Sequence, residues 1–176
     1  MTMWVFGYGS LLWNPGFPVA RREVATLQDY ARSFCMTSIH HRGTEEKPGL
    51  VLALDAHKDT TCTGLALSVE VGHEEQTLAE LRERELISSA YLERDLEVEL
   101  ASGEIVTAVT YIIDPHHVQY CGGLSLEEQA QIISHAVGGR GPNTEYLFNT
   151  ASHLAEIGLR DADLDWLSRR VRHLTA

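Results

Sequence analysis

The sequence predicts an α+β fold in which strands come first, form a curled or closed sheet, and are followed by helices. Short apolar or alternating runs typical of strands occupy most of the chain before Pro115. One helical stretch interrupts them, and the patterns after Pro115 are helical. This order is typical of α+β proteins, whose helices pack against the outside of a sheet.

Length and composition fit a single domain over residues 1–176, with enough interior for a hydrophobic core. The chain is 44% hydrophobic and 22% charged, which are ordinary globular values. Its three cysteines lie far apart and form no C-x-x-C pair, which indicates free thiols in a reducing compartment. No signal-peptide pattern or apolar run of membrane length is present. We therefore expect a cytoplasmic protein.

The charge balance disfavours two classes of partner. There are 14 basic and 25 acidic residues, so the formal net charge is −11, and no basic stripe is visible. A strongly acidic protein is repelled by nucleic acid and by anionic membrane surfaces. We expect neither nucleic acid nor membrane as a partner, whereas a small anionic substrate held by local arginines and backbone amides stays possible.

The first half of the chain is expected to be mostly strand. The patterns predict strands at residues 3–8, 22–30, 33–40, 49–55 and 61–70. Gly64 lies within the last of these runs and suggests a β-bulge. The pattern then becomes helical over residues 73–87.

The second half begins with a hairpin and ends in helices. Residues 95–101 alternate apolar and acidic side chains, and Ser102-Gly103 turns the chain into a strand at 104–113. A capping-box pattern at 125–128 opens a helix that extends to about residue 137. After a glycine-rich loop at 138–143, apolar stripes predict two more helices, the last carrying Leu164, Leu167, Val171 and Leu174.

The central helix carries a glutamate on its apolar face. Successive residues rotate by about 100° around a helix, so Leu78, Leu81 and Glu85 share one face, while Glu83 points to solvent. Burial raises the pKa of a carboxyl group and suits it to proton transfer near neutral pH. The alternative is a structural ion pair between Glu85 and Arg82 on the same side of the helix.

A glycine-flanked turn interrupts the first strand at Gly7-Tyr8-Gly9-Ser10. The turn lacks the third glycine and the following helix of a dinucleotide-binding fingerprint, and it lacks the G-x-S-x-G pattern of serine hydrolases. Two interpretations remain. Its backbone N–H groups form a nest for an anion, or it is a tight turn filled by Tyr8.

Together these motifs resemble those of ChaC-like γ-glutamylcyclotransferases. The resemblance starts with Trp4-Val-Phe-Gly-Tyr-Gly-Ser-Leu-Leu-Trp13 and includes Arg84-Glu85 in the central helix. Four further matches lie at residues 32–34, 41–43, 47–49 and 141–147. The motifs keep their order and spacing over nearly the whole chain.

The resemblance implies a fold, a reaction and a set of site residues. It implies a small, closed or nearly closed mixed β-barrel with flanking helices, and no metal or organic cofactor. The implied reaction degrades glutathione by cyclising its γ-glutamyl group, which releases 5-oxoproline and cysteinylglycine. Glu85 is then the general acid/base, and the substrate-binding residues are Tyr8, Gly9, Ser10, Leu11, Arg32, Tyr91 and Tyr120.

One stretch departs from the family pattern. Many relatives follow the glutamate with Lys-Gly-Gly-Tyr, whereas Leu86-Ile-Ser-Ser-Ala-Tyr91 follows it here. Tyr91 is the expected substrate-side tyrosine, but the stretch before it is longer. Two alternatives therefore stay open: a cyclotransferase for other γ-glutamyl peptides or γ-glutamylamines, and a non-catalytic γ-glutamyl-binding regulatory protein.

Overall fold

The computed structural model describes residues 2–86 and 89–176. Five strands form a closed barrel in the order β1-β3-β2-β4-β5, which confirms the predicted α+β barrel. They are β1 (Trp4–Gly7), β2 (Val19–Ser38), β3 (Gly49–Val69), β4 (Tyr91–Leu100) and β5 (Ile105–Ile113). β1 closes the barrel by pairing antiparallel to β3 and parallel to β5. Closure leaves no free sheet edge at this join.

The described residues divide into two compact units. Among the described residues, the first contains 2–32, 54–86 and 89–118, and the second contains 33–53 and 119–176. β1, β4 and β5 belong to the first unit, whereas β2 and β3 each have residues in both. The single domain expected from the sequence stays a prediction.

Two predicted pairs of strands are each one long strand, so the expected breaks near residues 31 and 58 were wrong. Both strands contain an aspartate with left-handed backbone geometry, Asp29 at φ 69° and Asp59 at φ 65°. Aspartate tolerates this conformation better than most residues. Asp29 Oδ1 also accepts a hydrogen bond from the Asp59 backbone N–H at 3.0 Å. The two strands therefore continue through these positions.

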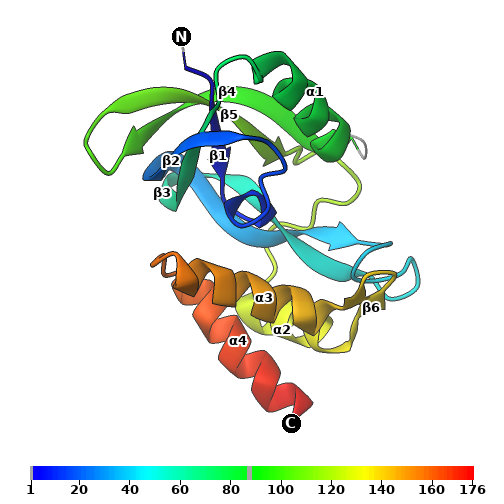
Figure 1. Cartoon of the computed structure of the whole chain (residues 1–176). Coiled ribbons are helices and arrows are strands. Elements are labelled where there is room, and N and C mark those ends of the chain that lie inside the picture. Colours follow the sequence, from blue (N-terminus) through cyan, green and yellow to red (C-terminus); the bar gives the residue numbers. More distant parts are fainter. Residues whose placement is uncertain (1, 87–88) are drawn as a thin grey trace. The chain divides into compact units, whose positions relative to one another are not determined.

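The first unit also holds the 3₁₀ turn η1 (Ser10–Leu12) and helix α1 (Glu74–Glu85). β4 and β5 form the predicted hairpin (Figure 1). Their register runs from Tyr91↔Ile113 to Glu99↔Ile105. We define the α1 cluster as the buried residues that pack together beneath this helix: Val5, Leu11, Val69, Leu81 and Tyr111. This cluster joins α1 to η1 and to three barrel strands.

Gly64 allows a close approach between strands. β1 and β3 pair in an unbroken register from Gly7↔Leu65 to Trp4↔Ser68, immediately after Gly64. A Cβ atom at Gly64 would collide with the Gly7 carbonyl oxygen and lie 3.0 Å from the Phe6 ring. The glycine is therefore required by this contact between backbones.

The second unit contains three helices, α2 (Leu126–His135), α3 (Asn143–Glu156) and α4 (Ala162–Thr175), which pack against one another (Figure 1). The predicted capping box is confirmed. The Ser125 hydroxyl accepts the Glu128 backbone N–H at 3.1 Å, and the Glu128 carboxylate accepts the Ser125 backbone N–H at 3.1 Å. Where a loop was expected, a small hairpin forms from β6 (Val137–Gly138) and β7 (Gly141–Pro142).

Several glycine-rich motifs in the second unit are explained by backbone packing. A Cβ atom at Gly43, Gly49 or Gly138 would collide with the backbone of another segment. Asn143 is fully buried. Its Oδ1 accepts the Leu50 N–H at 2.8 Å, and its Nδ2 donates to the Leu50 carbonyl at 2.9 Å, so the side chain pairs with the Leu50 backbone as a neighbouring strand would. These residues therefore have structural roles.

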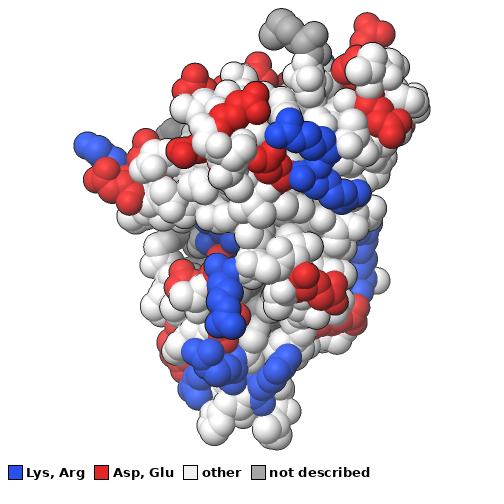
Figure 2. Space-filling model, turned by 60° about the vertical axis from the view of Figure 1, so that its left-hand side comes forward, with Lys and Arg blue, Asp and Glu red and all other residues white. Residues whose placement is uncertain are grey.

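The surface and the helices bear on the expected partners. On the face shown in Figure 2, basic and acidic side chains are interspersed. Within residues 2–86 and 89–176, no helix has both the length and the apolar character needed to cross a membrane.

Candidate active site

Glu85 lies at the last position of α1, with its side chain 16% exposed. Burial raises the pKa of its carboxyl group, and the positive charge of Arg84 partly opposes that shift. Glu83, two residues earlier, is exposed. The helical phase that distinguished these two glutamates in the sequence is therefore confirmed.

Arg84 connects Glu85 to the glycine-flanked turn. Its Nη2 donates to the Ser10 hydroxyl at 2.8 Å, and its Nη1 donates to the Asn14 carbonyl at 2.9 Å. Its Nε lies 3.5 Å from Glu85 Oε1. One guanidinium group therefore contacts both the turn after β1 and the half-buried carboxyl of α1. The sequence offered no local signal for this contact between distant segments.

The turn itself is a short 3₁₀ element that begins after Gly9. The Leu12 N–H donates to the Gly9 carbonyl at 2.9 Å, and the Asn14 N–H donates to the Ser10 carbonyl at 2.8 Å. Helical backbone leaves its first N–H groups without acceptors inside the helix. The N–H groups of Ser10 and Leu11 occupy these first positions, so the turn itself offers them no acceptor.

Ser10 shows no sign of activation as a nucleophile. Among the described residues, its hydroxyl accepts from Arg84, and no histidine or carboxylate accepts a hydrogen bond from it. An activated serine needs an adjacent general base that takes its proton. This environment fits a binding or structural role for Ser10.

Arg32 supports the backbone of the turn. Its Nε donates to the Tyr8 carbonyl at 2.7 Å, and its Nη2 donates to the Thr63 carbonyl at 2.6 Å. Tyr8 is buried, at 8% exposure. These bonds tie the first residue of the predicted binding motif to β2 and β3, which fixes the direction in which the turn leaves the barrel.

Tyr91 and Tyr120 are the remaining predicted site residues. Tyr91 begins β4 and packs, half-buried, against the α1 cluster. Tyr120 belongs to the second unit, where it forms an isolated antiparallel bridge with Met36. Within the stretch that departs from the family pattern, Ile87 and Ser88 lie outside the described residues. The binding roles of both tyrosines stay predictions.

A charged pair that joins α1 to β4 was missed from the sequence. Glu93 on β4 accepts two hydrogen bonds from Arg82, at 3.0 Å from Nε and 2.9 Å from Nη2. It also accepts a hydrogen bond from the Tyr111 hydroxyl at 2.8 Å. The alternative of an ion pair between Arg82 and Glu85 is therefore not the one observed, because Arg82 pairs with Glu93.

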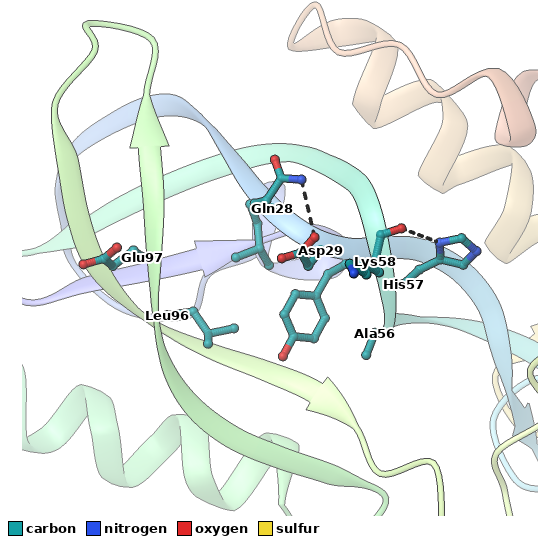
Figure 3. Close-up of a pocket in the computed structure, with 9 residues that line it drawn as sticks. Gln28, Asp29, Ala56, His57, Lys58, Leu96 and Glu97 are labelled. Carbon is teal, nitrogen blue, oxygen red and sulfur yellow. Dashed lines mark hydrogen bonds between the residues drawn. The ribbon is translucent and has the colours of Figure 1, made fainter.

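The first unit also has an open hollow of about 630 Å³ that contains none of the predicted site residues (Figure 3). It is lined by residues 27–30 of β2, 56–58 of β3 and 96–97 of β4. β2 pairs with β4 at Ala25↔Leu100 and Thr26↔Glu99, and the residues that line the hollow follow these pairs along β2. Its lining brings together no group in contact with Glu85.

The fold and the site together define a barrel protein in which a half-buried carboxyl of raised pKa lies at the end of α1, linked through Arg84 to a turn whose serine has no general base beside it among the described residues. The same fold occurs in a yeast γ-glutamyl cyclotransferase specific to glutathione, whose crystal structure matches with a TM-score of 0.85 and 23% identity, covering 100% of both chains. The model of the protein family described as "ChaC-like protein" matches residues 3–174 of the chain. The chain belongs to this ChaC-like family.

Curated relatives agree with this assignment. The glutathione-specific γ-glutamylcyclotransferase of Escherichia coli (strain K12) is 36% identical over 174 residues, which cover 99% of this chain and 74% of the relative. Gamma-glutamylcyclotransferase 2-3 of Arabidopsis thaliana is 33% identical over 180 residues, covering 99% and 90%. The similarity therefore extends across both units.

Proposed function

We propose that this protein degrades glutathione by cyclising its γ-glutamyl group to 5-oxoproline and releasing cysteinylglycine. The observation that carries the proposal is the half-buried carboxyl of Glu85, linked through Arg84 to the Ser10 turn. The names of the relatives support the choice of substrate. Other γ-glutamyl peptides fit the same reaction class.

The reaction needs little covalent chemistry from the protein. The α-amine of the γ-glutamyl group attacks its own γ-carbonyl carbon and closes a five-membered ring. Holding such groups in attack geometry can supply an effective concentration on the order of 10⁵ M or more. A serine or cysteine nucleophile is therefore unnecessary, in agreement with the unactivated surroundings of Ser10.

Glu85 is the group proposed to move the proton. Its carboxylate takes a proton from the substrate ammonium, which frees the lone pair for attack. The C–N bond to cysteinylglycine then breaks as the same carboxyl returns this proton to the departing amine, and a second proton lost by the ring nitrogen passes to the amine in the same way, so that it leaves as an ammonium. A raised pKa suits both steps, because the group must exchange its proton near neutral pH.

The turn is proposed to bind the γ-glutamyl group. The backbone N–H groups of Gly9, Ser10 and Leu11 are proposed to bind the substrate α-carboxylate or the oxyanion that forms at the γ-carbonyl. Arg32 is proposed to hold the backbone of Tyr8 in place for this binding. Tyr91 and Tyr120 are proposed as further substrate contacts, and the proposed reaction uses no cofactor.

The test is to incubate the purified protein with glutathione and to measure 5-oxoproline and cysteinylglycine by mass spectrometry. A parallel panel of γ-glutamyl dipeptides and γ-glutamylamines tests the alternative specificity suggested by the stretch after Glu85. If a γ-glutamylamine is turned over faster than glutathione, the γ-glutamylamine is the preferred substrate and the glutathione proposal is rejected. Binding without product from any of these compounds would instead favour a regulatory protein.

A further inference from the structure

The last turn of α1 places two arginines close to Glu85. Arg84 is adjacent in sequence, and Arg82 lies three residues earlier, a spacing at which helical side chains meet on one face. An arginine in contact with a carboxylate stabilises its charged form and lowers the carboxyl pKa. A general acid/base beside two free arginines would therefore lose its proton too readily.

Both arginines are held by other groups. Arg84 directs its Nη atoms to Ser10 and Asn14, and only its Nε lies near Glu85, at 3.5 Å. Arg82 points instead to β4, where both oxygens of Glu93 accept its hydrogen bonds at 2.9–3.0 Å. This two-point geometry fixes the direction of the Arg82 guanidinium.

Tyr111 holds the position of Glu93. Its ring is 2% exposed within the α1 cluster, and its hydroxyl donates to Glu93 Oε1 at 2.8 Å. Burial raises the pKa of Tyr111, and the hydrogen bond to Glu93 adds to this effect, so the hydroxyl stays a donor. Glu93 is thus anchored from β5 while it binds a cation from α1.

Arg82 and Arg84 share α1 with Glu85, Glu93 on β4 holds Arg82, and Tyr111 on β5 interacts electrostatically with both Glu85 and Glu93. We propose that Glu93 is a positioning residue that binds the Arg82 guanidinium and so prevents it from pairing with Glu85. The inference rests on the proposed function of Glu85 as the proton carrier, but the geometry of Glu93 is independent of substrate identity.

The direct test is Glu93→Gln, followed by titration of the Glu85 carboxyl by ¹³C NMR on glutamate-labelled protein. A glutamine presents an NH₂ group where Arg82 needs an acceptor, so the two-point interaction is lost. Arg82 then becomes free to pair with Glu85, and we expect the pKa of Glu85 to fall by about one unit. The Glu85→Gln spectrum identifies the resonance.

Arg82→Gln provides the matched control. Since Glu93 already holds Arg82, this variant should leave the Glu85 titration nearly unchanged. In the double variant Arg82→Gln/Glu93→Gln, the second change should not lower the pKa of Glu85 further, because the Arg82 guanidinium that would pair with Glu85 is gone. An equal downward shift with and without Arg82 would overturn the proposal, since it would come from the charge of Glu93 alone.

Glu93→Asp provides a second route if Glu93→Gln does not fold. It keeps the charge but shortens the side chain, so it weakens the hold on Arg82, and a smaller downward shift is expected. An unchanged Glu85 titration in this folded variant would count against the proposal. The pH dependence of kcat/KM for glutathione should shift in the same direction as the NMR titration.

The two readouts separate the two proposals. Absence of turnover in the unmodified protein would reject the proposed function while the NMR comparison still tests the role of Glu93. Normal turnover with an unmoved Glu85 titration in Glu93→Gln would reject the positioning role alone.

Discussion

The Nη2 atom of Arg84 donates a hydrogen bond to the Ser10 hydroxyl at 2.8 Å, across 74 positions of sequence. This contact places the end of α1 against the turn after β1. Because Glu85 follows Arg84 directly, the contact also determines where the half-buried carboxyl lies. The relation between these two residues therefore brings the proposed proton carrier and the proposed binding turn together.

Ser10→Ala tests whether the serine binds or reacts. If the substrate amine is the nucleophile, loss of the hydroxyl removes one contact to Arg84 and leaves the chemistry in place. We expect KM for glutathione to rise several-fold while kcat falls by less than about tenfold. Steady-state kinetics measure both values. A loss of kcat of about 10⁴-fold or more would indicate covalent catalysis by Ser10.

Glu85→Gln tests the proposed proton carrier. The amide is similar in shape but cannot exchange a proton, so we expect turnover to fall by about 10²–10⁴-fold or more. Circular dichroism should show an unchanged fold. Glu83→Gln is the matched control, because Glu83 lies on the same helix but is exposed, and it should keep near-normal activity. Equal losses in both variants would contradict the assignment.

The same Glu85→Gln change should stabilise the protein at neutral pH. Burial raises the pKa of Glu85 above its unfolded value, so the folded state holds this proton more tightly than the unfolded state does. The resulting penalty is absent below the unfolded pKa and is fully present above the folded pKa. We expect a gain on the order of 1 kcal/mol in unfolding free energy at pH 8.

Urea denaturation at several pH values measures this gain. The advantage of Glu85→Gln should shrink as the pH falls and should vanish near pH 4. An advantage that is constant from pH 4 to pH 8 would mean that ionisation of Glu85 is not its origin.

Asn143→Ala tests a structural role in the second unit. The change leaves the buried N–H and carbonyl of Leu50 without the partners that Asn143 provides. Each unsatisfied buried group costs roughly 1–3 kcal/mol, so we expect a loss of about 2–4 kcal/mol in unfolding free energy. Thermal and urea unfolding check this value. Asn149 lies on the same helix but is exposed, so Asn149→Ala should change stability little. Similar losses in both variants would contradict the structural role of Asn143.

Local patterns were sufficient to predict several features. The alternation in residues 95–101 predicted one strand of the β4–β5 hairpin, and the motif at 125–128 predicted the start of α2, because both depend on neighbours in sequence. The inward phase of Glu85 followed from helical geometry in the same way. The ordered motifs predicted the barrel.

Contacts between distant segments were not predictable from these patterns. An ion pair of Arg82 with Glu85 was one interpretation, yet Arg82 binds Glu93, which β4 brings within 3.0 Å of it. The breaks expected near residues 31 and 58 do not occur, and the Asp59 N–H donates to Asp29 Oδ1 between the two continuous strands. In each case a partner far along the chain decides the outcome.

The continuity of β2 and β3 has a consequence for how the protein is made. The chain passes between the two units three times, after residues 32, 53 and 118, and two of these passages lie inside single strands. Neither unit corresponds to one uninterrupted stretch of the gene. Fragments that end within either strand would leave backbone donors and acceptors unpaired, and we expect such fragments to aggregate during expression or to be degraded by proteases.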